Sequence, residues 1–111
     1  MIDINQLNKE FENRVRLGIM SVLIVNEWVD FTEMKTILQV TDGNLASHSN
    51  ALEKAGYIEM KKEFVGKKPK TSYKATLEGK EAFNNHINLL EQLLKNKLFL
   101  LFHFEIQRTL K

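Results

Sequence analysis

The segment from residue 41 to residue 75 constrains the fold most, because it signals clearly where a helix begins and where it ends. Thr41 and Asp42 have side-chain oxygens that can accept backbone N–H groups in the first turn of a helix. This helix is predicted to run to about Ala55, and Gly56 can adopt the left-handed conformation that ends it. The sequence therefore predicts one central helix with defined ends.

A strand–turn–strand pattern follows the central helix directly. Tyr57–Phe64 and Thr71–Ala75 have the composition of two short β-strands. Residues 65–70 between them contain Gly66 and Pro69, which are both typical of turns. We therefore expect a two-stranded hairpin with its turn at 65–70.

Three further elements are expected before the central helix. Residues 1–26 have a helical pattern, with a kink or break at Asn13–Arg14. Trp28–Phe31 can form a short strand beside the hairpin, and a helix capped by Thr32 is expected over roughly Thr32–Gln39. Two short helices joined by about four residues are typical of a helix-turn-helix, and a hairpin after the second helix adds a wing. The predicted fold class is α+β, mostly helical: a winged helix-turn-helix with a two- to three-stranded wing and a long C-terminal dimerisation helix.

The central helix has one apolar side and one side of small or hydrogen-bonding residues. Leu45, Leu52 and Ala55 line the first side. The second side suits a helix that lies in the major groove of duplex DNA, because nothing bulky holds it away and amide or hydroxyl groups can meet base edges. A plain solvent face is the alternative, although such faces usually carry long charged residues. The predicted DNA-facing residues are Gly43, Asn44, Ser47, Asn50 and Lys54.

Positive charge is concentrated in the hairpin. Residues 1–60 carry a net charge of −4, residues 61–80 carry +5 and residues 81–111 carry +1. A basic hairpin of this kind can follow the sugar–phosphate backbone, and Lys67, Lys68 and Lys70 are the predicted contacts. On charge alone, a lysine-rich turn that only solvates the surface is an equal alternative.

The last long helix is expected from Leu77 to about Lys97, capped by Thr76. Its apolar stripe either folds back on the core or pairs with the same helix of a second chain. We favour the dimer, because one small reading helix alone would bind an operator weakly. The predicted dimer contacts are Phe83, Ile87, Leu90 and Leu94. Residues 1–97 are therefore expected to form one winged-helix domain. Residues 98–111 form a tail of unknown role, and its apolar run at 98–104 is too short to span a bilayer.

Several strings along residues 5–95 resemble the small winged-helix transcriptional regulators of the MarR/ArsR type. This resemblance implies a homodimeric regulator with a reading helix at Gly43–Lys54 and a wing at Lys67–Lys70 on the backbone. Ser49 departs from the pattern, because such helices usually have an apolar residue there. Either its hydroxyl forms a hydrogen bond to the carbonyl of Leu45, or the serine makes the helix pack slightly more loosely on the core. The strings are RLGIM at 16–20, TDGNLASH at 41–48, LEKAGYI at 52–58 and GKKPKTSY at 66–73.

Other classes of function have weaker support in the sequence. The chain has no cysteine, and His48, His86 and His103 have no helically spaced His or Cys partner, so no metal site and no cofactor are expected. No catalytic motif or phosphate-binding loop is present, which argues against an enzyme. Trp28 and Phe31 could line a pocket for a small-molecule effector, although aromatic residues beside a strand are more often part of the core.

We therefore predict a cytoplasmic, homodimeric regulator that binds duplex DNA sequence-specifically, with no membrane segment and no signal peptide. The alternative is a winged-helix module for protein–protein contact, in which the lysines only aid solubility. The dependence of binding on salt separates the two, because phosphate contacts weaken steeply as salt rises.

Overall fold

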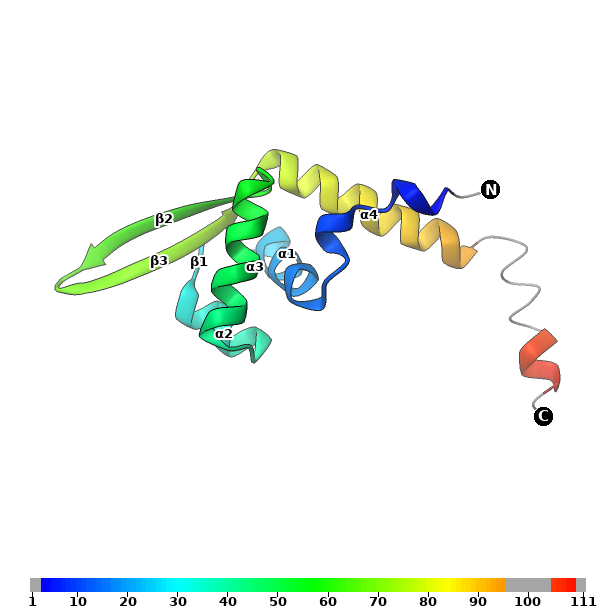
Figure 1. Cartoon of the computed structure of the whole chain (residues 1–111), viewed down its shortest axis with the longest axis horizontal. Helices are drawn as coiled ribbons and strands as arrows, with labels where there is room; N and C mark the ends of the chain where they lie inside the picture. The colour runs from blue at the N-terminus through cyan, green and yellow to red at the C-terminus, as the bar shows by residue number, and fades with distance from the viewer. Residues whose placement is uncertain (1–2, 96–104, 110–111) are drawn as a thin grey trace.

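The computed structural model describes residues 3–95 and 105–109, and it confirms the predicted α+β winged helix-turn-helix. Helices α1, α2 and α3 pack together, the β2–β3 hairpin extends away from them as the wing, and α4 leaves in the other direction (Figure 1). The three strands form one antiparallel sheet in the order β1-β3-β2. The elements are the 3-10 turns Ile4–Gln6 and Lys9–Phe11, followed by α1 (Arg14–Val25), β1 (Val29–Asp30), α2 (Phe31–Leu38), α3 (Asp42–Lys54), β2 (Ile58–Val65), β3 (Lys68–Ala75) and α4 (Leu77–Lys95).

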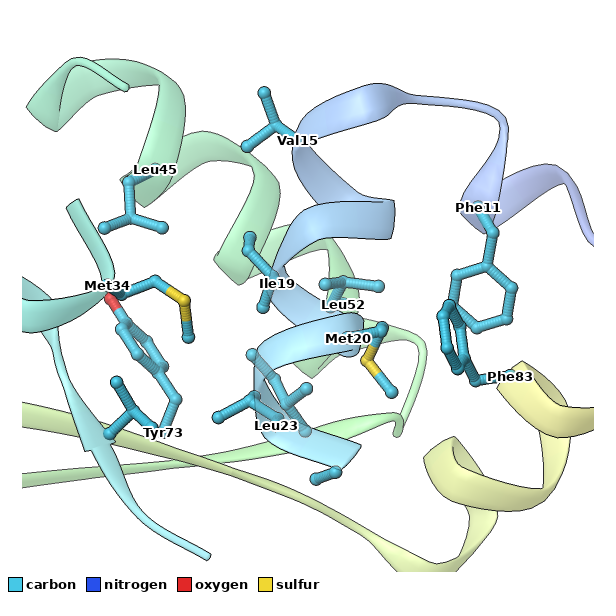
Figure 2. Packing of buried hydrophobic residues seen from close by; sticks show 13 residues of the cluster. Phe11, Val15, Ile19, Met20, Leu23, Met34, Leu45, Leu52, Tyr73 and Phe83 are labelled. Carbon is cyan, nitrogen blue, oxygen red and sulfur yellow. The ribbon is translucent and has the colours of Figure 1, made fainter. Parts of the chain in front are cut away.

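Helix α1 forms the centre of the hydrophobic core. Ile19, Met20 and Leu23 are almost fully buried, and residues of α2, α3, β3 and α4 pack around them (Figure 2). Burial of each such side chain stabilises the fold by about 1.5–3 kcal/mol. The predicted break in residues 1–26 falls at Asn13, whose side chain accepts the N–H groups of Val15 and Arg16 and so begins a new helix. The segment before it forms two 3-10 turns instead of a longer helix.

The cap of α2, the first helix of the helix-turn-helix, lies two positions earlier than predicted. Asp30, and not Thr32, caps α2, because its Oδ1 accepts the N–H of Glu33 at 2.8 Å. The same residue ends β1, which pairs with β3 through Val29–Tyr73 and Asp30–Ser72. The predicted third strand is therefore present, and the start of α2 is fixed to the sheet.

The turn of the wing is shorter than the sequence suggested. β2 and β3 pair through Val65 and Lys68, so the turn is only Gly66 and Lys67, with Gly66 at φ +66°. Pro69 lies in β3 opposite Phe64. Proline is compatible with this position because β1 pairs only with the proximal part of β3, which leaves the distal edge of β3 without a partner strand.

Helix α4 begins as predicted at a Thr76 cap. Its Oγ1 accepts the N–H of Gly79 at 2.9 Å and donates to the carbonyl of Gly56 at 2.7 Å. This double contact joins the start of α4 to the end of α3. Phe83 turns inward and meets Phe11 edge-on, with 5.5 Å between ring centroids (Figure 2).

The N-terminal segment is fastened to α4 through His86. The backbone N–H of Asn8 donates to His86 Nδ1 at 3.1 Å, and the Asn8 side chain donates to the Tyr57 hydroxyl at 2.8 Å. The imidazole is buried against the Phe11 ring, with centroids 5.4 Å apart. Burial lowers the pKa of His86 below its ordinary value, and the nearby Glu12 carboxylate opposes this only in part.

We expect this contact to make stability depend on pH. Because the pKa of His86 is lower in the folded state, the unfolded chain binds more protons once pH falls below about 6.5. The stabilisation is complete above about pH 6.5 and is lost as pH falls through the folded pKa. Urea midpoints at about pH 7.5 and about pH 5 should therefore differ more for the native chain than for His86→Gln, which keeps an acceptor but does not titrate. If the urea midpoint falls equally in both proteins between these two pH values, His86 does not cause the pH dependence.

Candidate nucleic-acid interface

The five residues predicted to face DNA all lie on the exposed side of α3. Each is solvent-exposed, whereas Leu45 and Leu52 on the opposite side are fully buried in the core. The helix is therefore held by its apolar side and presents a side of low bulk to the solvent. The exposed residues are Gly43, Asn44, Ser47, Asn50 and Lys54.

Ser49 holds α3 in place through hydrogen bonds. Its hydroxyl bonds back to the Leu45 carbonyl, which was one of the two interpretations of this residue from the sequence. Its fully buried Oγ donates to the Leu45 carbonyl at 2.7 Å and lies 3.3 Å from the Tyr73 hydroxyl oxygen. A serine has one hydroxyl proton, so Tyr73 can supply the proton of the second bond. Burial raises the pKa of Tyr73, and its hydroxyl therefore stays protonated as a donor. This pair links the reading helix to the middle strand of the sheet.

The turn that leads into α3 is also well defined. Gln39 adopts φ +54° and ends α2, with its N–H bonded to the Lys35 carbonyl. Thr41 caps α3 as predicted, since its Oγ1 accepts the N–H of Asn44 at 3.2 Å. Lys35 also forms a 2.8 Å ion pair with Asp42, across the turn. These contacts fix the angle between the two helices.

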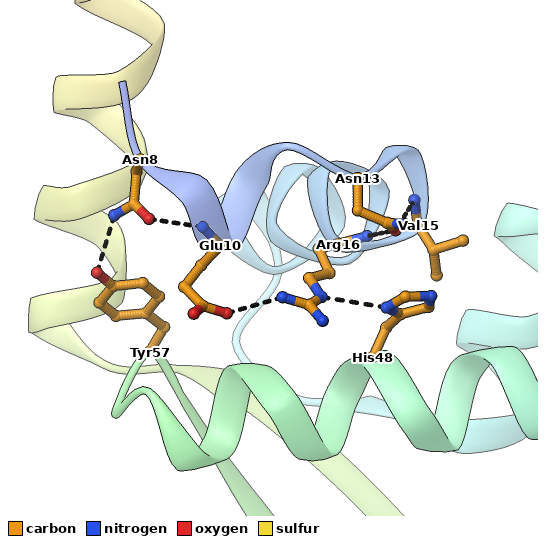
Figure 3. Close-up of polar contacts among 7 residues, drawn as sticks. All are labelled: Asn8, Glu10, Asn13, Val15, Arg16, His48 and Tyr57. Carbon is orange, nitrogen blue, oxygen red and sulfur yellow. Dashed lines mark hydrogen bonds and ion pairs between the residues drawn. The ribbon is translucent and has the colours of Figure 1, made fainter. Parts of the chain in front are cut away.

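A polar network links α3 to the segment before α1 (Figure 3). Arg16 donates from Nε to His48 Nδ1 at 3.1 Å and pairs with Glu10 at 2.8 Å. His48 is thus a hydrogen-bonded, half-buried ring on α3. Sequence reasoning did not identify Arg16 and Glu10, because their partners lie far along the chain. Neither residue shows a local signal for this role.

The lysines of the wing fall into two groups. At its base, Lys61 lies 4.4 Å above the Trp28 ring, and Lys74 lies 5.7 Å from the same ring and 3.4 Å from Glu27. Toward the tip, the described residues place no carboxylate within 4 Å of the three lysines predicted to touch the DNA backbone. Those three are fully available to a polyanion: Lys67, Lys68 and Lys70.

Trp28 and Phe31 lie in different surroundings. Trp28 lies under the lysines at the base of the wing, whereas Phe31 packs partly against the core. Phe31 also lines a hollow of about 270 Å³ between the start of α2 and residues 69–71. A second hollow of about 350 Å³ lies between the start of α1 and the end of α2, lined by Arg14, Val15, Leu38, Gln39 and Val40.

The outer side of α4 carries an apolar stripe that the described residues, 3–95 and 105–109, leave exposed. Ile87 and Leu94 are 37% and 60% exposed, and Leu90 is half-buried. Phe83 differs from them, because it is only 6% exposed and belongs to the core of its own chain. The predicted dimer contact at Phe83 is therefore corrected. The apolar run at 98–104 falls outside the described residues.

Two searches for other kinds of site were negative within residues 3–95 and 105–109. No group of three His, Cys, Asp or Glu side chains lies close enough together to hold a metal ion. No helix in this part of the chain is long and apolar enough to cross a membrane.

The chain has three packed helices, the third of which is held by its buried side, and a basic hairpin beside that helix. This arrangement defines a winged helix of the type found in transcriptional regulators. A family model described as a winged helix DNA-binding domain matches residues 15–94. The chain belongs to this family, and it is a DNA-binding regulator of the winged-helix class.

Known relatives agree with this assignment. An uncharacterised protein of Methanocaldococcus jannaschii is 40% identical over 88 residues, which cover 79% of this chain and 96% of the relative. A transcriptional regulator homologue from Pyrococcus horikoshii OT3 has 30% identity and a TM-score of 0.72, covering 78% of this chain and 85% of its own. MarR shares the fold at 16% identity, with a TM-score of 0.67 over 96% of this chain and 81% of its own. The predicted resemblance to MarR-type regulators is thus confirmed.

Proposed function

We propose that this chain is a cytoplasmic homodimeric transcriptional regulator that binds duplex DNA sequence-specifically without a cofactor. The observation that carries the proposal is the exposed, low-bulk side of α3 next to a wing whose tip lysines form no ion pair within 4 Å among the described residues. In this arrangement α3 enters the major groove and Asn44, Ser47 and Asn50 meet base edges, with Lys54 at the far end of the helix. Lys67, Lys68 and Lys70 contact phosphates and supply affinity that does not depend on sequence.

The dimer is proposed from the apolar stripe on α4 that is exposed within the described part of the chain. Ile87, Leu90 and Leu94 follow one side of this helix, and a two-fold pairing would bury each against its counterpart. A dimer also places two reading helices on one duplex, which raises both affinity and specificity. Sedimentation equilibrium tests this part, since the chain should sediment at twice its single-chain mass. A single-chain mass at micromolar concentration would contradict it.

Titration of a fluorescent duplex tests the function itself. The duplex comes from the region upstream of the gene for this chain, and a scrambled duplex of equal composition serves as the control. Tighter binding to the native duplex that weakens steeply with salt would support the proposal. Absence of binding at low salt would refute it and favour a winged helix that contacts proteins.

Replacing Asn50 by alanine should change sequence preference more than general affinity. A paired amide that reads an adenine contributes about 1–3 kcal/mol of discrimination, so the preference for the native duplex should fall by about 5- to 150-fold. Binding to scrambled duplex should stay within about twofold, because Asn50 carries no charge. Asn84→Ala is the matched control, since Asn84 is an exposed asparagine on α4. Unchanged preference in Asn50→Ala would remove Asn50 from the reading side.

A further inference from the structure

The tip of the wing carries an aromatic side chain that the fold does not use. Phe64 is 76% exposed and is the most exposed aromatic residue in the described part of the chain. Val65 beside it is 59% exposed. Large apolar side chains gathered at an exposed tip mark a contact site, because leaving them in water gains the fold nothing. The core ends well before this point, since every residue from 61 to 70 is exposed.

Strand register pairs Phe64 with a second rigid apolar residue. Phe64 lies directly opposite Pro69 in the β2–β3 ladder, so both side chains project from the same face of the wing. Directly opposed side chains have Cβ atoms about 5 Å apart, close enough for the ring to lie against the proline. The turn of Gly66 and Lys67 follows at once and keeps the ribbon narrow. Phe64 and Pro69 together form a compact apolar tip.

The charge around this tip indicates what it contacts. Residues 61–70 hold five lysines and one glutamate. Because side chains alternate between the two faces of a strand, Lys62 shares the face of Phe64, whereas Lys68 and Lys70 lie on the other face. A partner must therefore be apolar where it meets Phe64 and strongly negative on both sides. The minor groove of DNA has this form, with sugars and base edges between two walls of phosphate.

We propose, on the basis of the function proposed above, that the wing tip enters the minor groove and that Phe64 with Pro69 forms an apolar wedge there. The groove is about 6 Å wide, so only the tip of the ribbon enters it. Apolar wedges of this kind partly unstack a base step and bend the duplex away from the protein. Lys62 on the same face and Lys67 in the turn lie beside the wedge and can reach phosphates at the edge of the groove, while the wedge contacts the groove floor. Phe64 thus adds affinity that does not depend on salt, together with a preference for easily deformed base steps.

The test compares Phe64→Ala with Val25→Ala, because Val25 is an equally exposed apolar residue, at 77%, at the end of α1. Binding to the native duplex is followed by anisotropy, and bending by energy transfer between dyes on the two duplex ends. Phe64→Ala should bind about tenfold more weakly and bend the duplex less, with an unchanged slope of log K against log salt. Val25→Ala should match the native chain, and Phe64→Leu should recover most of the loss because leucine is also a wedge residue.

Three outcomes would overturn the inference. If Phe64→Ala binds and bends the duplex like the native chain, the tip is not a wedge, although the proposed function stands. Binding of both proteins to anionic phospholipid vesicles is measured alongside. If Phe64→Ala binds the duplex like the native chain but binds these vesicles more weakly than the native chain does, the tip contacts a lipid surface instead. If the native chain itself does not bind duplex, the proposed function fails and the wedge fails with it.

Discussion

Replacing Gly79 by alanine is expected to lower the melting temperature by about 12–24 °C. A Cβ atom at this position would lie 2.0 Å from the carbonyl oxygen of Tyr57 and 2.8 Å from its carbonyl carbon. Both atoms belong to the backbone, so no side-chain rotation can relieve the clash. Overpacking of this kind costs about 3 kcal/mol, and 1 kcal/mol shifts the midpoint of a domain of this size by about 4–8 °C.

The backbone at Tyr57 cannot move away easily, because it is held by the junction between α3, β2 and α4. The Tyr57 carbonyl accepts the N–H of Thr76 at 3.0 Å, and Thr76 also bonds to Gly56 and Gly79. A shift of Tyr57 would therefore break the cap of α4 and the left-handed end of α3 together. Displacement at this junction would reach α3 as well as α4.

Gly43→Ala provides the matched control for this prediction. Gly43 is an exposed helical glycine, and no atom lies within 4 Å of a Cβ built there. Its replacement should leave the melting temperature unchanged or raise it slightly, since alanine favours the helix by up to about 1 kcal/mol. Thermal unfolding followed by circular dichroism at 222 nm, the usual helix signal, compares the two variants. Equal melting temperatures for them would show that the Gly79 contact relaxes at no cost.

This glycine also illustrates what sequence reasoning could and could not predict. The ends of α3 and the cap of α4 were predicted correctly, because Thr41, Gly56 and Thr76 act on backbone groups within a few residues. The need for glycine at Gly79 was invisible, because the atom that excludes a side chain belongs to Tyr57, more than twenty residues earlier.

The features of the candidate interface also fall into two groups, those that the sequence could predict and those that it could not. The exposed side of α3 and the lysines of the wing follow from helical spacing and charge, which are local properties. The Arg16–His48 contact joins two helices, and no spacing within either helix reveals it. Phe83 was misjudged for a related reason. Its place in the apolar stripe of α4 is clear, but only the packed structure shows that Phe11 already covers it.

Removing the three tip lysines together should have the largest effect on DNA binding. In Lys67→Ala/Lys68→Ala/Lys70→Ala, affinity for the native duplex should fall by at least about 30-fold near 0.1 M salt. Each phosphate contact contributes about 0.9 to the slope of log K against log salt, so the slope should become shallower by up to about 2.7 for each wing that touches the duplex. Stability should hardly change, because these side chains are exposed and form no ion pair within 4 Å among the described residues, although Glu63 lies opposite Lys70 in the strand pair.

A charge-matched control decides whether this effect belongs to the wing. Lys9→Ala/Lys80→Ala/Lys95→Ala removes the same charge from three exposed positions outside the hairpin. If the tip lysines contact phosphates directly, the control should keep most of its affinity and its salt slope, because exposed charges more than about 10 Å away are largely screened at 0.1 M salt. An equal loss in both variants would mean that net charge alone attracts the duplex. The wing would then have no defined place on the DNA backbone, and α3 would have to account for docking on its own.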